Sequence, residues 1–305
     1  MKLKNLTCMA FVLLCLFAVS MARGEGEKYI LQNCWEAGSY DLQFNSVITT
    51  TKSGDKPIPD QELYRHMLKW DVKADAEKDG TQEFRMKLTR LVTRVFINNK
   101  TLVQFDSSND RERGLECLAD AFAKIVDVEI VLVVKDGAPA EVRGYSEKMW
   151  EEILKDRDAR EQGLIGIVQT LLSDDNIKQT YETLSYLDAS DEVALGDTWK
   201  SDTILELPGV GDKTLEWNCR LDRVLKAAGR VVADVSGTGE IEFDVAEKKL
   251  QIVMSANSKY DVAAAFPIEA KSSVTMTLRD KESSDEKSSE LITVSQKSNL
   301  TIAKH

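Results

Sequence analysis

Hydrophobic and polar residues alternate along much of the chain with a period of two, which is the pattern of a half-buried β-strand. The first clear segment spans 64–73, where Arg65, Lys69, Asp71 and Lys73 form the charged face. The other face consists of Tyr64, His66, Leu68, Trp70 and Val72. After the turn residues Asp79-Gly80, Phe84, Met86 and Leu88 alternate with charged neighbours. An Asp-Gly pair between two alternating segments predicts a long antiparallel hairpin.

The alternation slips by one position at Leu91, ahead of Val92, Val95 and Ile97. Such a slip predicts a β-bulge or bend that curves the sheet. A second hairpin is expected where the alternating segment 128–134 meets Asp136-Gly137 and leaves through Val142.

Helical spacing and capping residues mark a different stretch of the chain. A helix is expected at 114–125, after the capping residues of 106–110. Ser146 is a suitable N-cap for a second helix, which Gly163 is expected to interrupt, and Ser173 for a further one. These helices lie between two β-rich stretches.

Alternation returns from Trp199 onward. Besides the segment 215–222, strands are expected at 231–235, 241–245, 250–254, 260–266 and 274–278. A charged, serine-rich loop at 280–289 precedes a weak last strand at 291–294, and the tail to His305 is expected to fray.

The segment Glu83–Val92 aligns without gaps with Glu216–Leu225, since both read acid, aromatic, any residue, apolar, basic, Leu, any residue, Arg, apolar, apolar. Duplication of a β-unit explains this match, and chance agreement between two amphipathic strands is the alternative. The fold class expected is therefore α+β and mainly antiparallel β. It consists of two pseudo-repeated curved sheets or one half-barrel, with a central helical insert.

The N-terminus has the features of a secretory signal. Lys2 and Lys4 precede an apolar run from Leu6 to Val19 and a small-x-small cleavage site ending at Ala22. The expected organisation is a signal peptide at 1–22, a β-rich half at 23–145, a helical insert at 146–190 and a second β-rich half at 191–305. We expect an exported protein of the periplasm or extracellular space, with no membrane-spanning segment after cleavage.

Removal of Lys2 and Lys4 would change the formal net charge from −11 to −13. So acidic a surface argues against nucleic-acid partners. Of the five cysteines, Cys34, Cys117 and Cys219 would remain, which allows one disulfide plus a free thiol or three buried thiols. They are too far apart, with no nearby histidine, to suggest a zinc site.

No combination of residues in the sequence indicates catalysis, and no catalytic, cofactor or metal residue is assigned. His66 lies within an alternating segment and is expected on its core face, and His305 is at the end. The Ser-x-x-Lys matches at 53–56 and 284–287 lie in polar stretches. Segment 209–214 lacks the spacing of a phosphate loop and is better explained by a hairpin turn.

Two groups of acidic and aromatic residues are also considered as binding sites. Asp71, Asp75 and Asp79 are spaced by four, unlike a calcium loop, and are expected to flank a solvated turn. Five tryptophans offer either a ligand cavity or ordinary core packing: Trp35, Trp70, Trp150, Trp199 and Trp217.

Four short motifs occur in a characteristic order along the chain. They are Gly38-Ser39-Tyr40, Asp79-Gly80, Phe105-Asp106-Ser107-Ser108 and Leu195-Gly196-Asp197-Thr198-Trp199. This order resembles a family of uncharacterised exported bacterial proteins, a domain of unknown function with a Gly-Asp-(Ser/Thr)-Trp motif. The resemblance covers most of 29–265. A proline frequent in that family before the last motif is absent here, where Ala189-Ser190 stands. The resemblance implies export and a β-rich fold, and transfers no catalytic residue.

The function expected is non-catalytic service in the cell envelope, with an apolar ligand or lipid held between sheet and helices, or an envelope protein as partner. The alternatives are a protein-interaction or structural module that uses a sheet edge and, less favoured, a carboxylate-dependent hydrolase. No cofactor is expected.

Overall fold

The fold is known from a computed structural model of the whole chain. It describes residues 27–31, 33, 35–53, 60–108, 121–207, 210–227, 230–246, 248–264, 266–280 and 291–305. Within these residues no helix is long and apolar enough to cross a membrane. The predicted signal peptide lies outside the described residues, as does the loop expected at 280–289 except for Asp280, which ends a strand. Most of the helix expected at 114–125 also lies outside them, and 121–123 are helical.

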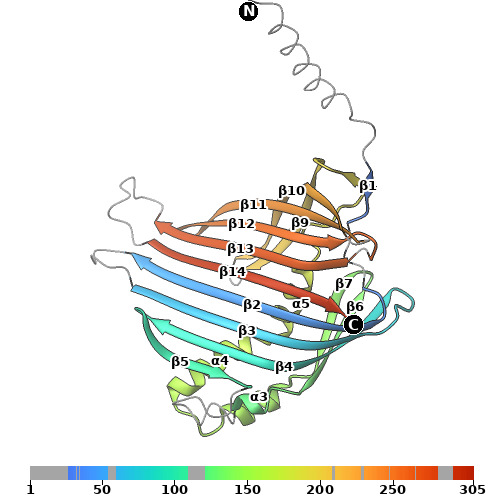
Figure 1. Cartoon of the computed structure of the whole chain (residues 1–305). Helices are drawn as coiled ribbons and strands as arrows, with labels where there is room; N and C mark the ends of the chain where they lie inside the picture. The colour runs from blue at the N-terminus through green and yellow to red at the C-terminus, as the bar shows by residue number, and fades with distance from the viewer. Residues whose placement is uncertain are drawn as a thin grey trace, which may run out of the picture.

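The described strands form one large antiparallel sheet and a separate two-stranded pair (Figure 1). The large sheet has the order β7-β6-β4-β3-β2-β14-β13-β12-β11-β10-β9, with β5 paired to β4 beside β6. Its strands are β2 Gly38–Ser53, β3 Asp60–Ala74, β4 Thr81–Ile97, β5 Lys100–Asp106, β6 Glu129–Lys135, β7 Ala138–Arg143, β9 Thr198–Leu207, β10 Gly211–Ala227, β11 Arg230–Val245, β12 Lys248–Asp261, β13 Phe266–Asp280 and β14 Leu291–Lys304. The pair joins β1 Lys28–Tyr29 to β8 Val193–Ala194. Since the order ends at β7 and β9, the sheet is open.

Three helices connect β7 to β8, and all lie on the same face of the sheet (Figure 1). They are α3 Glu147–Leu154, α4 Ala159–Leu171 and α5 Asp174–Thr183. Ser146 and Ser173 cap α3 and α5 as predicted, since their hydroxyls accept the backbone N–H groups of Met149 and Asn176. Gly163 was expected to interrupt a helix and does not, because it lies inside α4, and the chain instead breaks between Leu154 and the N-cap Asp158.

Strands from opposite ends of the sequence pair with each other in the centre of the sheet. β14 inserts between β13 and β2, so that Leu300 pairs with both Ala270 and Phe44. The two β-rich stretches therefore contribute to one continuous sheet rather than to two, and the single-sheet alternative is the one observed. Whether the three segments 23–145, 146–190 and 191–305 are separate units stays a prediction.

Both predicted hairpins are confirmed. β3 and β4 are joined through Asp79 and Gly80, and β6 and β7 through Asp136 and Gly137; all four residues have positive φ angles. The predicted bulge is also confirmed: Lys69 pairs with Arg90 while the next residue, Trp70, pairs with Leu88. The extra residue in β4 restores the buried positions of the later half of that strand to the helix-covered face.

Several expected strand boundaries near the C-terminus were wrong. The strands expected at 231–235 and 241–245 are one strand, β11, because Gly237 and Gly239 continue the alternation without side chains. The strand expected at 260–266 is instead the end of β12, a turn and the start of β13. The tail is not frayed, since β14 extends to Lys304 and the backbone N–H of His305 donates to the Ser39 carbonyl.

The two segments that suggested duplication form β4 and β10. Their bulges fall at aligned residues, Thr89 and Asp222. Their neighbours differ, because the strand before β4 lies toward the middle of the sheet, whereas the strand before β10 lies at its edge. Duplication therefore stays a prediction.

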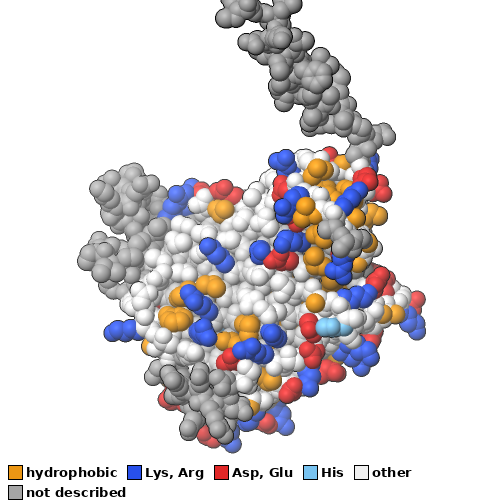
Figure 2. Space-filling model, viewed as in Figure 1, with side chains coloured by type: hydrophobic (Ala, Val, Ile, Leu, Met, Phe, Trp, Pro, Cys, Tyr) orange, Lys and Arg blue, Asp and Glu red, His pale blue; other side chains and the backbone are white. Residues whose placement is uncertain are grey.

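The two faces of the sheet differ in chemistry. Side chains on the helix-covered face form two buried apolar clusters, one beneath α3–α5 and one over β9–β12. The opposite face is rich in small neutral polar side chains; on β14 it presents Thr293, Ser295, Lys297, Asn299 and Thr301. Figure 2 shows this face as largely neutral, with scattered lysine and arginine. The apolar interior is thus confined to the helix side.

Candidate functional site

An apolar pocket lies between the middle of the sheet and helices α4 and α5. β2, β3, β4, β6 and β14 supply its floor, and the helices its roof. The lining residues are Trp35, Leu42, Phe44, Leu68, Trp70, Val72, Phe84, Met86, Leu132, Leu171, Asn176, Ile177, Thr180, Tyr181, Leu184 and Leu300. Besides the phenol of Tyr181 and the indoles of Trp35 and Trp70, the polar side chains in this lining are Asn176 and Thr180. The Asn176 amide donates to the carbonyl of Leu171 at the end of α4, and the Thr180 hydroxyl donates to the carbonyl of Asn176. The pocket therefore offers an apolar surface.

The pocket is narrow in this structure. Its cavity volume is about 50 Å³. Sites for drug-sized ligands have volumes of roughly 300–1,000 Å³. A ligand with a long chain therefore requires side chains of α5, or the helix itself, to move away from the sheet.

Trp35 is the aromatic centre of one end of the pocket. Its ring meets Tyr40, Phe84 and Phe266 edge-on, with centroid distances of 4.8, 5.2 and 4.8 Å. The indole is buried, and none of the described residues accepts a hydrogen bond from its Nε1. Edge-to-face contacts between aromatic rings fix their relative orientation. The cage therefore holds the tryptophan in one place.

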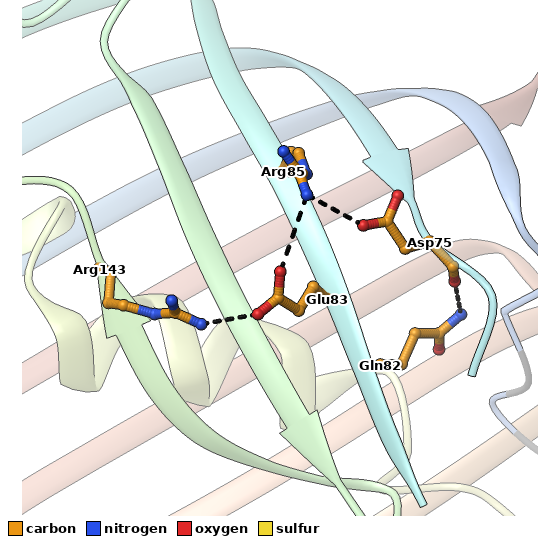
Figure 3. Close-up of polar contacts among 5 residues, drawn as sticks. All are labelled: Asp75, Gln82, Glu83, Arg85 and Arg143. Carbon is orange, nitrogen blue, oxygen red and sulfur yellow. Dashed lines mark hydrogen bonds and ion pairs between the residues drawn. The ribbon is translucent and has the colours of Figure 1, made fainter. Parts of the chain in front are cut away.

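The backbone of Trp35 is tied to the β3–β4 hairpin by a buried glutamine. The Gln82 amide donates to the Trp35 carbonyl at 3.0 Å and to the Asp75 carbonyl at 2.9 Å. Figure 3 shows Gln82 beside Asp75, whose carboxylate forms an ion pair with Arg85. Glu83 forms ion pairs with both Arg85 and Arg143. These ion pairs are exposed and contribute little to stability. Gln82, in contrast, positions a wall of the pocket.

Next to the pocket, a row of polar side chains crosses four neighbouring strands on the same face. Ser298, Ser46, His66 and Thr93 are consecutive cross-strand partners on β14, β2, β3 and β4. The Gln296 amide reaches the hydroxyls of Ser46 and Ser298 at 3.4 and 3.2 Å. We call these five residues the polar row.

His66 is the most unusual member of the polar row. It is 3% exposed, which confirms the prediction that it lies on the core face. Its Nδ1 lies 3.2 Å from the Thr93 hydroxyl, whereas its Nε2 is buried and meets no hydrogen-bond partner in the part of the chain that the structure describes. Burial lowers the pKa of His66 to about 4, so the ring is neutral at physiological pH.

A second polar cluster ties the N-terminal segment to the chain after α5. The Asp188 carboxylate accepts the backbone N–H of Asn33 at 2.9 Å and the hydroxyl of Tyr260 at 3.0 Å. Its carbonyl accepts the Trp199 indole N–H. Burial raises the pKa of Asp188 to about 7 despite these donors. Each of these hydrogen bonds joins two different segments of the chain, so the role of this cluster is structural.

Other residues considered from the sequence lie apart from the pocket. Asp71 is exposed, and Asp75 and Asp79 flank the β3–β4 turn, as predicted. His305 is exposed, with its Nε2 3.0 Å from Asp41. Residues 211–214 begin β10, and Gly211 pairs with Leu207 of β9, so the two strands form a hairpin here as predicted.

The tryptophans divide between the two roles that the sequence left open. Trp35 and Trp70 line the pocket. Trp150 and Trp217 are buried in the apolar clusters, 6% and 0% exposed, and Trp199 packs against the second of them. Cys219 is a free, buried thiol, and burial raises its pKa to about 11. Cys34 and Cys117 lie outside the described residues, so the disulfide stays a prediction.

The sequence did not indicate Gln82 or the polar row as parts of a site. One signal was available, because a polar residue at an apolar position of an alternating strand marks a buried polar group. His66 and Ser46 occupy such positions in β3 and β2. Their convergence depends on strand register, which alternation does not show.

Comparisons with solved structures give weak likenesses. A lipovitellin structure concerned with lipid–protein interactions matches with a TM-score of 0.48 and 7% identity, over 89% of this chain and 26% of that one. An outer membrane channel from Pseudomonas putida F1 has a TM-score of 0.24 and 7% identity over 90% and 98% of the chains. A LolA superfamily protein from Nitrosomonas europaea has a TM-score of 0.14 and 10% identity over 90% and 87%. The chain thus spans about a quarter of the lipovitellin chain, and none of these scores establishes a common fold.

No curated protein matches the sequence. A family model described as a family of unknown function, DUF6263, matches residues 79–281, from the β3–β4 turn to the end of β13. This match confirms the expected resemblance to a domain of unknown function. The chain belongs to this family of unknown function, DUF6263.

Proposed function

We propose that this protein is an exported, non-catalytic protein of the cell envelope that binds an apolar ligand, such as a lipid acyl chain, between its sheet and helices α4 and α5. The observation that carries the proposal is the pocket, whose walls are almost entirely apolar and aromatic. Transfer of an acyl chain from water into such surroundings is favourable by roughly 0.8 kcal/mol per buried CH₂ group. Export rests on the charged, apolar and small-residue order of residues 1–22.

The first experiment tests for a natural ligand. The mature protein is purified from its own envelope and weighed by native mass spectrometry, and its organic extract is analysed for lipids. We expect one lipid per chain. An empty protein that carries other protein chains would contradict the proposal.

A second experiment places the ligand in the pocket. Bromine quenches tryptophan fluorescence at short range, and two of the five tryptophans line the pocket. A brominated acyl chain should quench the wild-type protein with saturation at one ligand per chain. The variant Trp35→Phe/Trp70→Phe should bind the ligand but lose most of this quenching.

Matched blocking variants complete this test. Thr180→Phe inserts a ring at a lining position of α5, and Gln179→Phe places the same ring at an exposed position on the same helix. Binding should weaken in the first variant and persist in the second. Equal binding by both would show that the acyl chain lies elsewhere.

A sheet edge supports a second candidate, a protein-interaction module. In the described sheet β9 pairs with β10 alone, and it exposes Ile204 by 65%. Unprotected edges accept an added strand, and lysine on an edge discourages this. Ile204→Lys should abolish such an association, measured by cross-linking and native mass spectrometry; an unchanged cross-linking pattern would exclude the edge.

A further inference from the structure

The polar row directly borders the apolar pocket. Ser46, His66 and Ser298 are each two residues from a pocket-lining residue of the same strand, namely Phe44, Leu68 and Leu300. Two residues along a strand span about 7 Å, and their side chains share one face. On each of these strands, an apolar residue of the pocket floor is therefore followed on the same face by a hydrogen-bonding residue of the polar row.

This row has unused hydrogen-bonding capacity. The buried Nε2 of His66 has no hydrogen-bond partner among the described residues. A buried polar atom left unpaired costs about 1–3 kcal/mol. Because the other ring nitrogen faces Thr93, whose hydroxyl can donate or accept, Nε2 can present either a lone pair or a proton. A ligand hydroxyl or carbonyl oxygen would satisfy it in one tautomer or the other.

The described side chains that directly flank the row along its strands, on the same face, carry no charge. One side-chain step further along β2, β3 and β4 lie Ile48, Tyr64 and Val95, and one step back lie apolar residues, including Leu91. The next residue of that face on β3 beyond Tyr64 is Glu62, an acid, whose carboxylate accepts the Tyr64 hydroxyl at 2.8 Å. A charged headgroup placed here would lose its hydration without gaining a counter-ion, which is strongly unfavourable. The row thus favours neutral hydrogen-bonding groups over phosphate or carboxylate.

We propose that the polar row binds the uncharged headgroup of an amphipathic acyl ester, such as a monoacylglycerol, whose chain occupies the apolar pocket. This inference rests on the proposed function. Four strands at about 4.8 Å spacing give the row a length of about 14 Å, which accommodates a glycerol-sized group. The polar row determines which lipid the pocket takes.

The test compares three brominated ligands of equal chain length, which are a monoacylglycerol, a fatty acid and an alkane, by quenching of tryptophan fluorescence. The wild-type protein should bind the monoacylglycerol most tightly. His66→Leu removes the ring nitrogens at similar size and should lower affinity for the monoacylglycerol about five- to tenfold, while affinity for the alkane is kept. His305→Leu, at the exposed histidine, should change neither.

Thr93→Val provides a second variant in case His66→Leu fails to fold. It removes the hydroxyl that faces Nδ1 and should also reduce the preference for the monoacylglycerol over the alkane. Binding of no ligand by the wild-type protein would refute the proposed function itself. Binding of all ligands with no loss of preference in either variant, or tightest binding of the fatty acid, would overturn only the assignment of the polar row.

Discussion

Replacement of Asp188 by asparagine is expected to change how stability depends on pH. The native pKa of about 7 lies well above the ordinary value of 3.8 because burial disfavours the ionised carboxyl. Between these two values the native state keeps a proton that the unfolded chain has released. The free energy of unfolding therefore falls as pH rises from about 4 through 7, and the contribution is complete below pH 4.

The size of this effect follows from the shift. About three pKa units correspond to about 4 kcal/mol, which is an upper bound because the Asp188 side chain keeps some contact with solvent. An effect of about 2 kcal/mol would lower the melting temperature by roughly 4–8 °C in a protein of this size. The donors Asn33 and Tyr260 reduce the cost of ionisation without removing it.

The assay is thermal unfolding of the wild type and Asp188→Asn at intervals from pH 4 to 8. Asparagine does not titrate, so the melting temperature of the wild type should fall relative to the variant as pH rises. Any constant offset between them reflects the altered hydrogen bonds and does not affect the slope. Asp191→Asn, at an exposed carboxyl nearby, should follow the wild type. Parallel profiles for wild type and Asp188→Asn would refute the reasoning.

Three further expectations concern packing and reactivity. Gly144→Ala should destabilise the protein more than Gly137→Ala, measured by urea unfolding. Both glycines have a positive φ angle. A Cβ at Gly144 would lie 2.9 Å from a backbone oxygen of β6, whereas a Cβ at Gly137 would have no described atom within 4 Å. Trp217→Phe removes the indole N–H that donates to the buried Thr203 hydroxyl at 3.1 Å and should lower the free energy of unfolding by about 1–3 kcal/mol. Adding Thr203→Val to this variant should reduce the loss. In a variant whose other four cysteines are serine, Cys219 should resist a maleimide at pH 8 until urea unfolds the protein, because its pKa is about 11; rapid labelling of the folded chain would contradict its burial.

Part of the candidate site could be foreseen from the sequence. Tryptophans on alternating faces suggested a cavity or a core, and Trp35 and Trp70 do line the pocket. Trp217 has a similar alternating context but packs against Tyr186 in the other cluster. Local pattern predicts that a side chain points inward, but which helix covers it depends on contacts between residues far apart in the sequence.

Local signals alone determined the character of the chain. Alternation predicted the β3–β4 hairpin and its faces, the slip at Leu91 predicted the bulge, and Ser146 and Ser173 predicted two helix starts. These features depend on residues within a few positions of each other, so side-chain period, turn chemistry and capping are sufficient to specify them.

Only the tertiary structure decided how these elements combine. β14 looked like a short strand with a frayed tail, yet its pairing with β2 and β13 places it in the middle of the sheet. Its partner β2 lies more than two hundred residues away, and no local pattern encodes that register. The same long-range pairing aligns Ser298 with Ser46 and His66, so the polar row exists because the two ends of the chain meet there.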